Sequence, residues 1–186
     1  MNLPNKLTVS RLYMTALMVF CLSFHVQYSY MAAFILFMMA AITDALDGHL
    51  ARTKYGVTDF GKLMDPLADK VLTSAAFIAF VQLNMIPAWF AITIITREFM
   101  VTGLRLLVAG RGTVMPAGIW GKLKTIFQMI SISLALLLLG LGDCGIESCV
   151  YAHWLTFITM YLALTFTIIS GVEYFWKYRE EFMHGA

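Results

Sequence analysis

The sequence predicts an all-α, polytopic membrane protein with about six transmembrane helices. Of its 186 residues, 60% are hydrophobic and 13% are charged, and the mean hydropathy is +0.78. Soluble domains are usually about half apolar and about one quarter charged. Two further observations support the prediction. The chain contains six long apolar segments, and 11 of its 13 Lys and Arg residues lie on one side of the membrane that these segments would cross.

Each apolar segment is close to the roughly 20 residues that a helix needs to cross a bilayer. Gly, Pro and polar residues separate the segments. We find no internal repeat or interdomain linker, so we expect a single domain over residues 1–186. No small-residue cleavage site follows the first segment, which is therefore expected to be a retained span. The expected spans are 8–25, 29–50, 66–84, 87–109, 123–142 and 152–175.

The placement of Lys and Arg predicts the orientation of the spans. With a cytoplasmic N-terminus, the loops expected outside lie near residues 25–28, 83–86 and 141–153, and these contain no Lys or Arg. Cations are enriched in cytoplasmic loops, so we expect both termini in the cytoplasm. The cations at the expected cytoplasmic ends are Lys6, Arg11, Arg52, Lys54, Lys62, Arg105, Arg111, Lys122, Lys124, Lys177 and Arg179.

Two cysteines fall in the last of the expected outer loops. Cys144 and Cys149 would face an oxidising compartment, where a disulfide is permitted. Two unpaired thiols in a short loop are the alternative. Cys21 lies inside an expected span and is interpreted as a packed apolar residue.

Four aspartates lie where the second and third spans reach the cytoplasm. Asp44 and Asp47 share one helix face, and Asp65 and Asp69 share another. Ionisable residues in membrane segments are costly and usually mark a functional site. Clustered carboxylates repel one another unless a cation neutralises them, and oxygen ligands suit Mg²⁺ or Mn²⁺. In the alternative interpretation these acids flank a loop and pair with neighbouring cations, namely Arg52, Lys54, Lys62 and Lys70.

The spacing of the aspartates matches a family signature. Residues 44–70 read DALDGHLARTKYGVTDFGKLMDPLADK. The fixed positions are Asp44-x-x-Asp47-Gly48-x-x-Ala51-Arg52 and, after eight intervening residues, Gly61-x-x-x-Asp65-x-x-x-Asp69. By this signature and its six-span layout, the chain resembles the CDP-alcohol phosphotransferase family. Members of that family transfer a substituted phosphate from a CDP-linked donor to an alcohol and release CMP.

The resemblance implies roles for the signature residues. Asp44, Asp47, Asp65 and Asp69 would hold two Mg²⁺ or Mn²⁺ ions, and Asp69 would also be the catalytic general base. Asn5 and Thr8, near the start of the chain, would lie close to the nucleotide, although Thr8 as a helix N-cap is an alternative. The full set expected to bind CDP-diacylglycerol is Asn5, Thr8, Gly48, Ala51, Arg52 and Gly61.

A second group of charged residues indicates an acceptor that carries a phosphate. Arg97 interrupts the fourth apolar segment, and Arg105 follows two turns later. Clustered Arg and Lys side chains suit a phosphate group. Two alternatives remain open: Arg97 pairs with Glu98, and Arg111, Lys122 and Lys124 are the loop cations that membrane topology alone predicts. The residues expected to bind the acceptor, glycerol 3-phosphate, are Arg97, Arg105, Arg111, Lys122 and Lys124.

Residues 2–11, 96–99 and 121–128 resemble the bacterial phosphatidylglycerophosphate synthases within the family. This resemblance implies transfer of the phosphatidyl group of CDP-diacylglycerol to glycerol 3-phosphate. It also implies a homodimer in the bacterial inner membrane, surrounded by lipids, with its active site facing the cytoplasm and no nucleic-acid partner. Alternative acceptors are inositol phosphate, serine and phosphatidylglycerol. A divalent-metal transporter is a further alternative, because carboxylates within the membrane also mark transporters.

Overall fold

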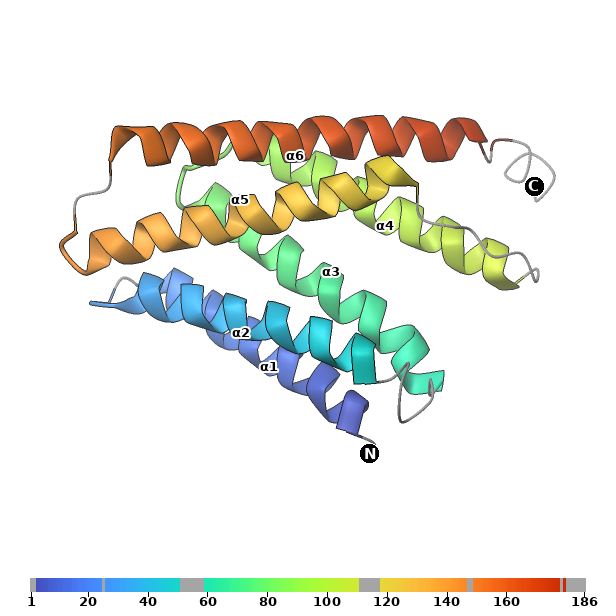
Figure 1. Cartoon of the computed structure of the whole chain (residues 1–186), viewed down its shortest axis with the longest axis horizontal. Coiled ribbons are helices and arrows are strands. Elements are labelled where there is room, and N and C mark those ends of the chain that lie inside the picture. The colour runs from blue at the N-terminus through green and yellow to red at the C-terminus, as the bar shows by residue number, and fades with distance from the viewer. Residues whose placement is uncertain are drawn as a thin grey trace.

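Six helices form almost all of the structure. The computed structural model describes residues 3–24, 26–50, 59–110, 118–146, 149–177 and 179, and this part contains no strand. The predicted all-α class is confirmed, and each expected apolar segment falls in a separate helix (Figure 1). The helices are α1 (Leu3–Ser23), α2 (Ser29–Leu50), α3 (Asp59–Gln82), α4 (Ala88–Gly110), α5 (Ile119–Asp143) and α6 (Val150–Lys177).

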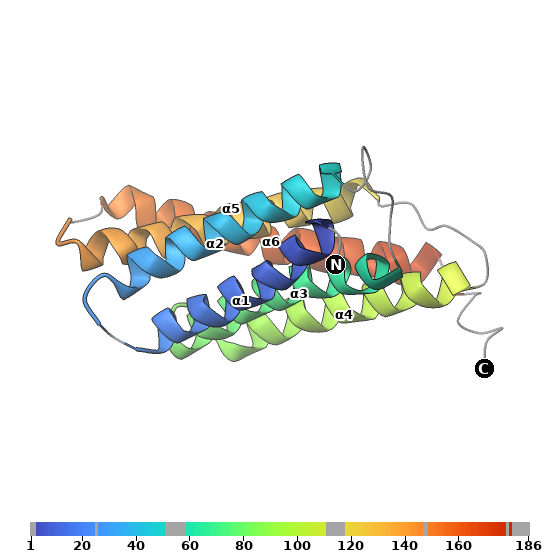
Figure 2. The same cartoon turned by 90° about the horizontal axis from the view of Figure 1, so that it is seen from below.

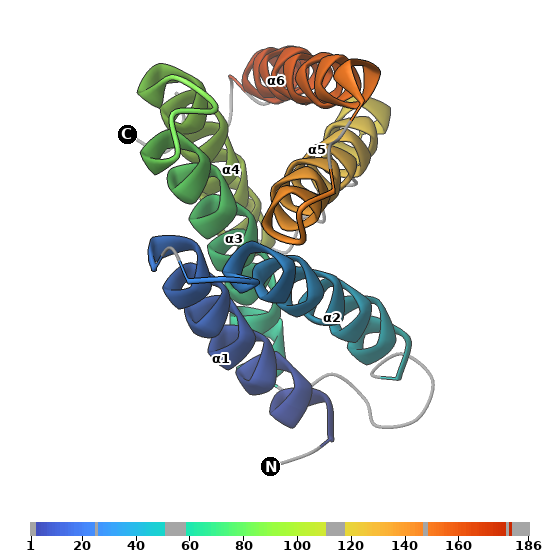
Figure 3. The same cartoon turned by 90° about the vertical axis from the view of Figure 1, so that its left-hand side faces the viewer.

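The helices run up and down in an elongated bundle. α1 packs along α2, α5 packs along α6, and α2 joins the two pairs by packing on α5. α3 packs against both α1 and α4, and the end-on view of Figure 3 shows it deep between the other helices. The starts of α1, α3 and α5 and the ends of α2, α4 and α6 gather at one end of the bundle (Figure 2). Among the described residues, the expected cytoplasmic cations lie in the halves of the helices nearest this end, namely Lys6, Arg11, Arg105, Lys122, Lys124 and Lys177.

The outer surface is apolar over much of its area. Every helix exposes large apolar side chains, among them Leu17, Ile35, Ile78, Ile92, Ile130 and Leu155. By length and composition, the helical stretches Lys6–Ser23, Ile119–Asp143 and Val150–Lys177 can each cross a membrane, and α2 adds a shorter apolar run, Ser29–Asp44. An apolar exterior around an interior that contains charge is the pattern of a protein embedded in lipid. The chain is thus an all-α membrane protein.

The helices α2 and α5 approach each other closely at Gly140. A Cβ atom on this glycine would lie 2.9 Å from the Cα atom of Met31 in α2, so a larger residue does not fit without moving the backbone. Close approach through small residues is a common mode of helix packing in membranes. The Tyr30 backbone N–H donates a 2.8 Å hydrogen bond to the Asp143 carboxylate, which fastens the start of α2 to the end of α5.

Short loops close the opposite end of the bundle. Asn84, between α3 and α4, has a φ of 57°, a left-handed conformation that Asn tolerates better than most residues. Cys144 and Cys149 lie between α5 and α6, and both are exposed and free. The alternative of two unpaired thiols therefore describes this structure.

We predict that Gly140→Ala lowers the thermal stability of the detergent-solubilised protein. Overpacking of a tight contact typically costs about 1–3 kcal/mol, and here the added methyl meets backbone that cannot rotate away. Gly142→Ala is the matched control, since a Cβ at that position meets nothing within 4 Å. Alanine at Gly142 should be neutral or stabilising, because Ala favours a helix by about 1 kcal/mol over Gly. Equal melting temperatures for both variants would contradict the close α2–α5 contact.

Candidate functional site

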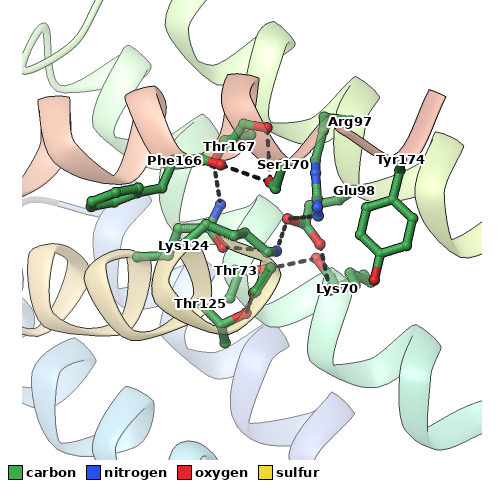
Figure 4. Close-up of polar contacts among 12 residues, drawn as sticks. Lys70, Thr73, Arg97, Glu98, Lys124, Thr125, Phe166, Thr167, Ser170 and Tyr174 are labelled. Atoms are coloured by element: carbon green, nitrogen blue, oxygen red, sulfur yellow. Dashed lines mark hydrogen bonds and ion pairs between the residues drawn. The ribbon is translucent and has the colours of Figure 1, made fainter. Parts of the chain in front are cut away.

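Three helices bring charged side chains to one buried point. Glu98 of α4 is 2% exposed; its carboxylate accepts a hydrogen bond from the ammonium group of Lys124 in α5 and forms an ion pair with that of Lys70 in α3 (Figure 4). Lys124 is itself 3% exposed. A buried ion needs partners that satisfy its charge and its hydrogen bonds, and removing one partner is strongly destabilising. Glu98 therefore links α3, α4 and α5 through charge.

A row of polar groups extends from this point toward α6. The Lys124 ammonium lies 3.4 Å from Gln128 Oε1, and the Gln128 amide donates to Thr167 Oγ1 at 3.3 Å. Thr167 donates in turn to the backbone carbonyl of Ala163 at 2.6 Å. Gln128 and Thr167 are both buried. The row fixes the position of Lys124 relative to α6.

Two arginines of α4 meet a tyrosine of α6. The guanidinium carbons of Arg97 and Arg105 lie 5.8 Å and 5.2 Å from the centre of the Tyr174 ring. The Tyr174 hydroxyl accepts a hydrogen bond from Arg105. Gly171 leaves room for Arg97, because a Cβ there would lie 3.2 Å from Arg97 Cγ. The ring thus holds both cations at the same side of the bundle.

These groups surround a cavity of about 540 Å³ between α3, α4 and α5. Five cationic side chains and two carboxylates line it, so its net charge is positive. Asp69 contributes one carboxylate, which is one third exposed and lies 3.5 Å from the Lys70 ammonium. The charged lining residues are Asp69, Lys70, Arg97, Glu98, Arg105, Lys122 and Lys124. Such a cavity suits an anionic ligand that must also meet a carboxylate.

The structure gathers most of the cations that the sequence assigned to the acceptor. Arg97, Arg105, Lys122 and Lys124 all line the cavity that contains Asp69, whereas Arg111 lies outside the described residues. The loop-cation interpretation is wrong for Lys124, which is buried within α5. Arg97 does approach Glu98, at 3.5 Å, but that carboxylate is also engaged by both lysines. An ion pair with Glu98 is therefore not a sufficient reason for an arginine at position 97.

The start of α1 meets the first signature aspartate. Arg11 is fully buried and forms an ion pair with Asp44 at 2.6 Å, so it is not a solvated cation at the membrane surface. Thr8 is also fully buried and lies inside α1, which begins at Leu3. The interpretation of Thr8 as a helix N-cap is therefore wrong. The contact between Arg11 and Asp44 anchors α1 to α2 beside the aspartate signature.

Only part of the expected metal and nucleotide site can be placed. The side chains of Asn5, Asp47 and Asp65 lie outside the described part, as do the surroundings of Gly48 and Gly61. Ala51 and Arg52 lie outside it entirely. Among the described residues, no group of three or more His, Cys, Asp or Glu side chains could hold a metal. The two described carboxylates of the set, Asp44 and Asp69, are 45% and 33% exposed. Their oxygen chemistry and accessibility fit Mg²⁺ or Mn²⁺.

The sequence did not single out Glu98, Lys70 or Tyr174 as site residues. An acid inside an apolar segment was the available signal for Glu98, but it was interpreted only as a partner of Arg97. Lys70 was considered only as a countercharge for the aspartates. No sequence signal distinguished Tyr174 from other aromatic residues in a membrane helix, because its contacts come from α4 and α5.

Comparisons with known proteins agree with the signature. The family model for CDP-alcohol phosphatidyltransferase matches residues 1–169. A Bacillus subtilis (strain 168) protein named CDP-diacylglycerol--glycerol-3-phosphate 3-phosphatidyltransferase is 42% identical, with 95% of this chain and 94% of the relative covered.

Two further relatives are similar over most of their length. A Rickettsia bellii protein with the same name as the Bacillus relative is 36% identical, with 94% of this chain and 93% of the relative covered. A Mycobacterium tuberculosis (strain ATCC 25618 / H37Rv) protein named probable phosphatidylglycerophosphate synthase is 39% identical, with coverages of 93% and 79%. Because the family match and these relatives extend over nearly the whole chain, this protein belongs to the CDP-alcohol phosphatidyltransferase family.

Proposed function

We propose that the protein transfers the phosphatidyl group of CDP-diacylglycerol to glycerol 3-phosphate, giving phosphatidylglycerophosphate and CMP. The observation that supports the proposal most directly is the cavity that is lined by both the Asp69 carboxylate and five cationic side chains. The names of the relatives support the choice of donor and acceptor. Membership of the family favours this transferase over a divalent-metal transporter.

The cations of the cavity would bind the phosphate of the acceptor. Arginine presents several N–H donors in a planar fork that matches phosphate oxygens. Arg97 and Arg105 each have a buried Nε atom that makes no hydrogen bond within the described part of the chain. Lys124 and Lys122 add positive charge from α5. The phosphate would thus lie against α4 and α5, leaving the hydroxyl of the acceptor to face Asp69 on α3.

In the proposed reaction, Asp69 accepts the proton of the acceptor hydroxyl as its oxygen attacks the β-phosphorus of the donor. The new phosphorus–oxygen bond replaces the bond to CMP, which departs with the electron pair. Bringing base, hydroxyl and phosphorus together accounts for much of the rate enhancement in such reactions. Asp44, Asp47, Asp65 and Asp69 would hold the divalent ions, which when bound would neutralise charge on the diphosphate.

The donor is proposed to bind beside the aspartate signature. Its nucleotide would contact Asn5, Thr8, Gly48, Ala51, Arg52 and Gly61, while its acyl chains stay in the bilayer. The catalytic domain would extend over residues 1–186, with the cation-bearing end of the bundle in the cytoplasm and the protein in the bacterial inner membrane. The distribution of Lys and Arg supports this orientation. A homodimer is part of the proposal and rests on the family resemblance.

The first prediction from the proposed function concerns the acceptor. Purified protein in detergent, given CDP-diacylglycerol and Mg²⁺ or Mn²⁺, should release CMP with glycerol 3-phosphate, and EDTA should stop the release. Release only with serine, phosphatidylglycerol or inositol phosphate would keep the chemistry and replace the acceptor. Folded protein that releases no CMP with any acceptor would contradict the transferase and favour metal transport.

The second prediction concerns the base. Asp69→Asn should lower kcat by at least about 100-fold, because general base catalysis typically contributes that much or more. Asn keeps the size of the side chain, so the melting temperature should stay close to that of the wild type. Near-normal turnover by a folded Asn variant would exclude Asp69 as the base.

The third prediction concerns acceptor binding. Arg97→Ala should raise the KM for glycerol 3-phosphate by about tenfold or more, since hydrogen bonds to charged groups contribute about 1.5–3 kcal/mol. The KM for CDP-diacylglycerol should change little. Arg179→Ala is the matched control, because Arg179 is exposed, stacks on Trp176 and does not line the cavity. An equal loss for donor and acceptor would show that Arg97 supports the fold.

A further inference from the structure

Tyr174 contacts both of the helices that supply the acceptor-binding cations. It lies in α6, is 4% exposed, and has Arg97 and Arg105 near its ring. Its hydroxyl accepts hydrogen bonds from the Arg105 guanidinium and, at 3.2 Å, from the backbone N–H of Gly118 just before α5. Among the described residues, no other aromatic ring lies within cation–π distance of both arginines. Figure 4 shows the ring beside Arg97.

The arrangement brings together two cations that repel each other. Arg97 and Arg105 are eight residues apart on α4, which corresponds to about 12 Å along a helix. Both guanidinium groups nevertheless lie within 6 Å of the same ring centre. The electron-rich face of an aromatic ring attracts cations. Tyr174 therefore offsets part of the repulsion and keeps both groups close to its ring.

The same ring packs on the start of α5. A Cβ atom on Gly121 would lie 3.8 Å from Tyr174 Cε2, an ordinary van der Waals contact, so the helix passes close to the ring. Lys122 and Lys124 follow directly on α5 and line the same cavity. Through its ring and hydroxyl, Tyr174 thus sets the position of α5 relative to the arginines of α4.

We propose that Tyr174 is a positioning residue that holds Arg97 and Arg105 together for the phosphate of the acceptor. This inference rests on the proposed function and extends it to a residue outside the family signature. Tyr174 would not touch the reacting atoms. Tyr174 would hold the two guanidinium groups in place. Their charge and their buried Nε–H donors, which have no partner among the described residues, would then bind one phosphate dianion. Its loss would weaken acceptor binding and leave the chemical step and the donor unaffected.

The experiment compares Tyr174→Leu and Tyr174→Phe with the wild type. Tyr174→Leu removes the ring and the hydroxyl, and we expect it to raise the KM for glycerol 3-phosphate by about tenfold, because two cation–π contacts are lost. Tyr174→Phe keeps the ring and should raise this KM by a smaller factor. The kcat and the KM for CDP-diacylglycerol should not change. Tyr161→Leu is the control, since Tyr161 also lies on α6 but packs edge-on against Phe90 away from the cavity.

A second measurement separates this inference from the proposed reaction. Inorganic phosphate should raise the melting temperature of the wild type and of Tyr161→Leu, and the rise should be reduced in Tyr174→Phe and absent in Tyr174→Leu. If the wild type rejects glycerol 3-phosphate but this pattern holds, the proposed acceptor is wrong and the role of Tyr174 stands.

Three outcomes would overturn the inference. The first is a Tyr174→Leu variant with the acceptor KM and the phosphate-induced shift of the wild type. The second is a wild type that phosphate does not stabilise. The third applies if the Leu variant does not fold. In that case the outcome that overturns the inference is a Phe variant whose acceptor KM and phosphate-induced shift both equal those of the wild type.

Discussion

The carboxylate of Glu98 is almost fully buried, and its two oxygens are engaged by lysines from two other helices. Burial of one such charge without partners would cost several kcal/mol. The partners Lys70 and Lys124 come from α3 and α5, so these helices must lie at a fixed depth and rotation relative to α4. The remaining features of the cavity depend on this constraint, since Asp69 and Arg97 are the neighbours in sequence of Lys70 and Glu98.

The interior charge also explains why the helices differ in character. α5 and α6 are apolar enough to cross a membrane by composition alone. α3 and α4 carry charges within their apolar stretches, and the described ones, Asp69, Lys70, Arg97, Glu98 and Arg105, face one another and the cavity rather than lipid. The apolar side chains exposed on every helix face outward instead. A membrane enzyme for a polar substrate requires this division, because charge facing lipid would be costly whereas charge lining a cavity can bind a ligand.

The sequence predicted the features that depend on local pattern. The six helices followed from the apolar segments, and the clustering of cations at one end of the bundle followed from the loops without Lys or Arg. Arg97 was also identified as a candidate site residue, because a charged residue inside an apolar segment is costly and usually functional.

Contacts between distant helices were not predictable in the same way. Nothing in the sequence indicated that Glu98 bridges Lys70 and Lys124, that Arg11 is buried against Asp44, or that Tyr174 collects two arginines. Each of these contacts depends on how helices rotate against partners far away in the chain. The sequence also left open that Lys124 is a loop cation, because it is only the second residue of the apolar segment expected at 123–142, whereas α5 begins at Ile119. A few residues of extra helix were enough to move this lysine from the surface to the interior.

The charge of the cavity bears directly on which acceptor fits. Five cations opposite two carboxylates repel one another while the cavity is empty of anions. A dianionic phosphate relieves this repulsion, so part of its binding free energy comes from interactions that the protein holds ready in advance. Serine brings no net negative charge and would leave the repulsion in place. With the proposed acceptor, the cavity would therefore favour phosphorylated alcohols over serine, through the same lysines and arginines that hold α3, α4, α5 and α6 together. Binding of the acceptor and the stability of this end of the bundle should accordingly be linked.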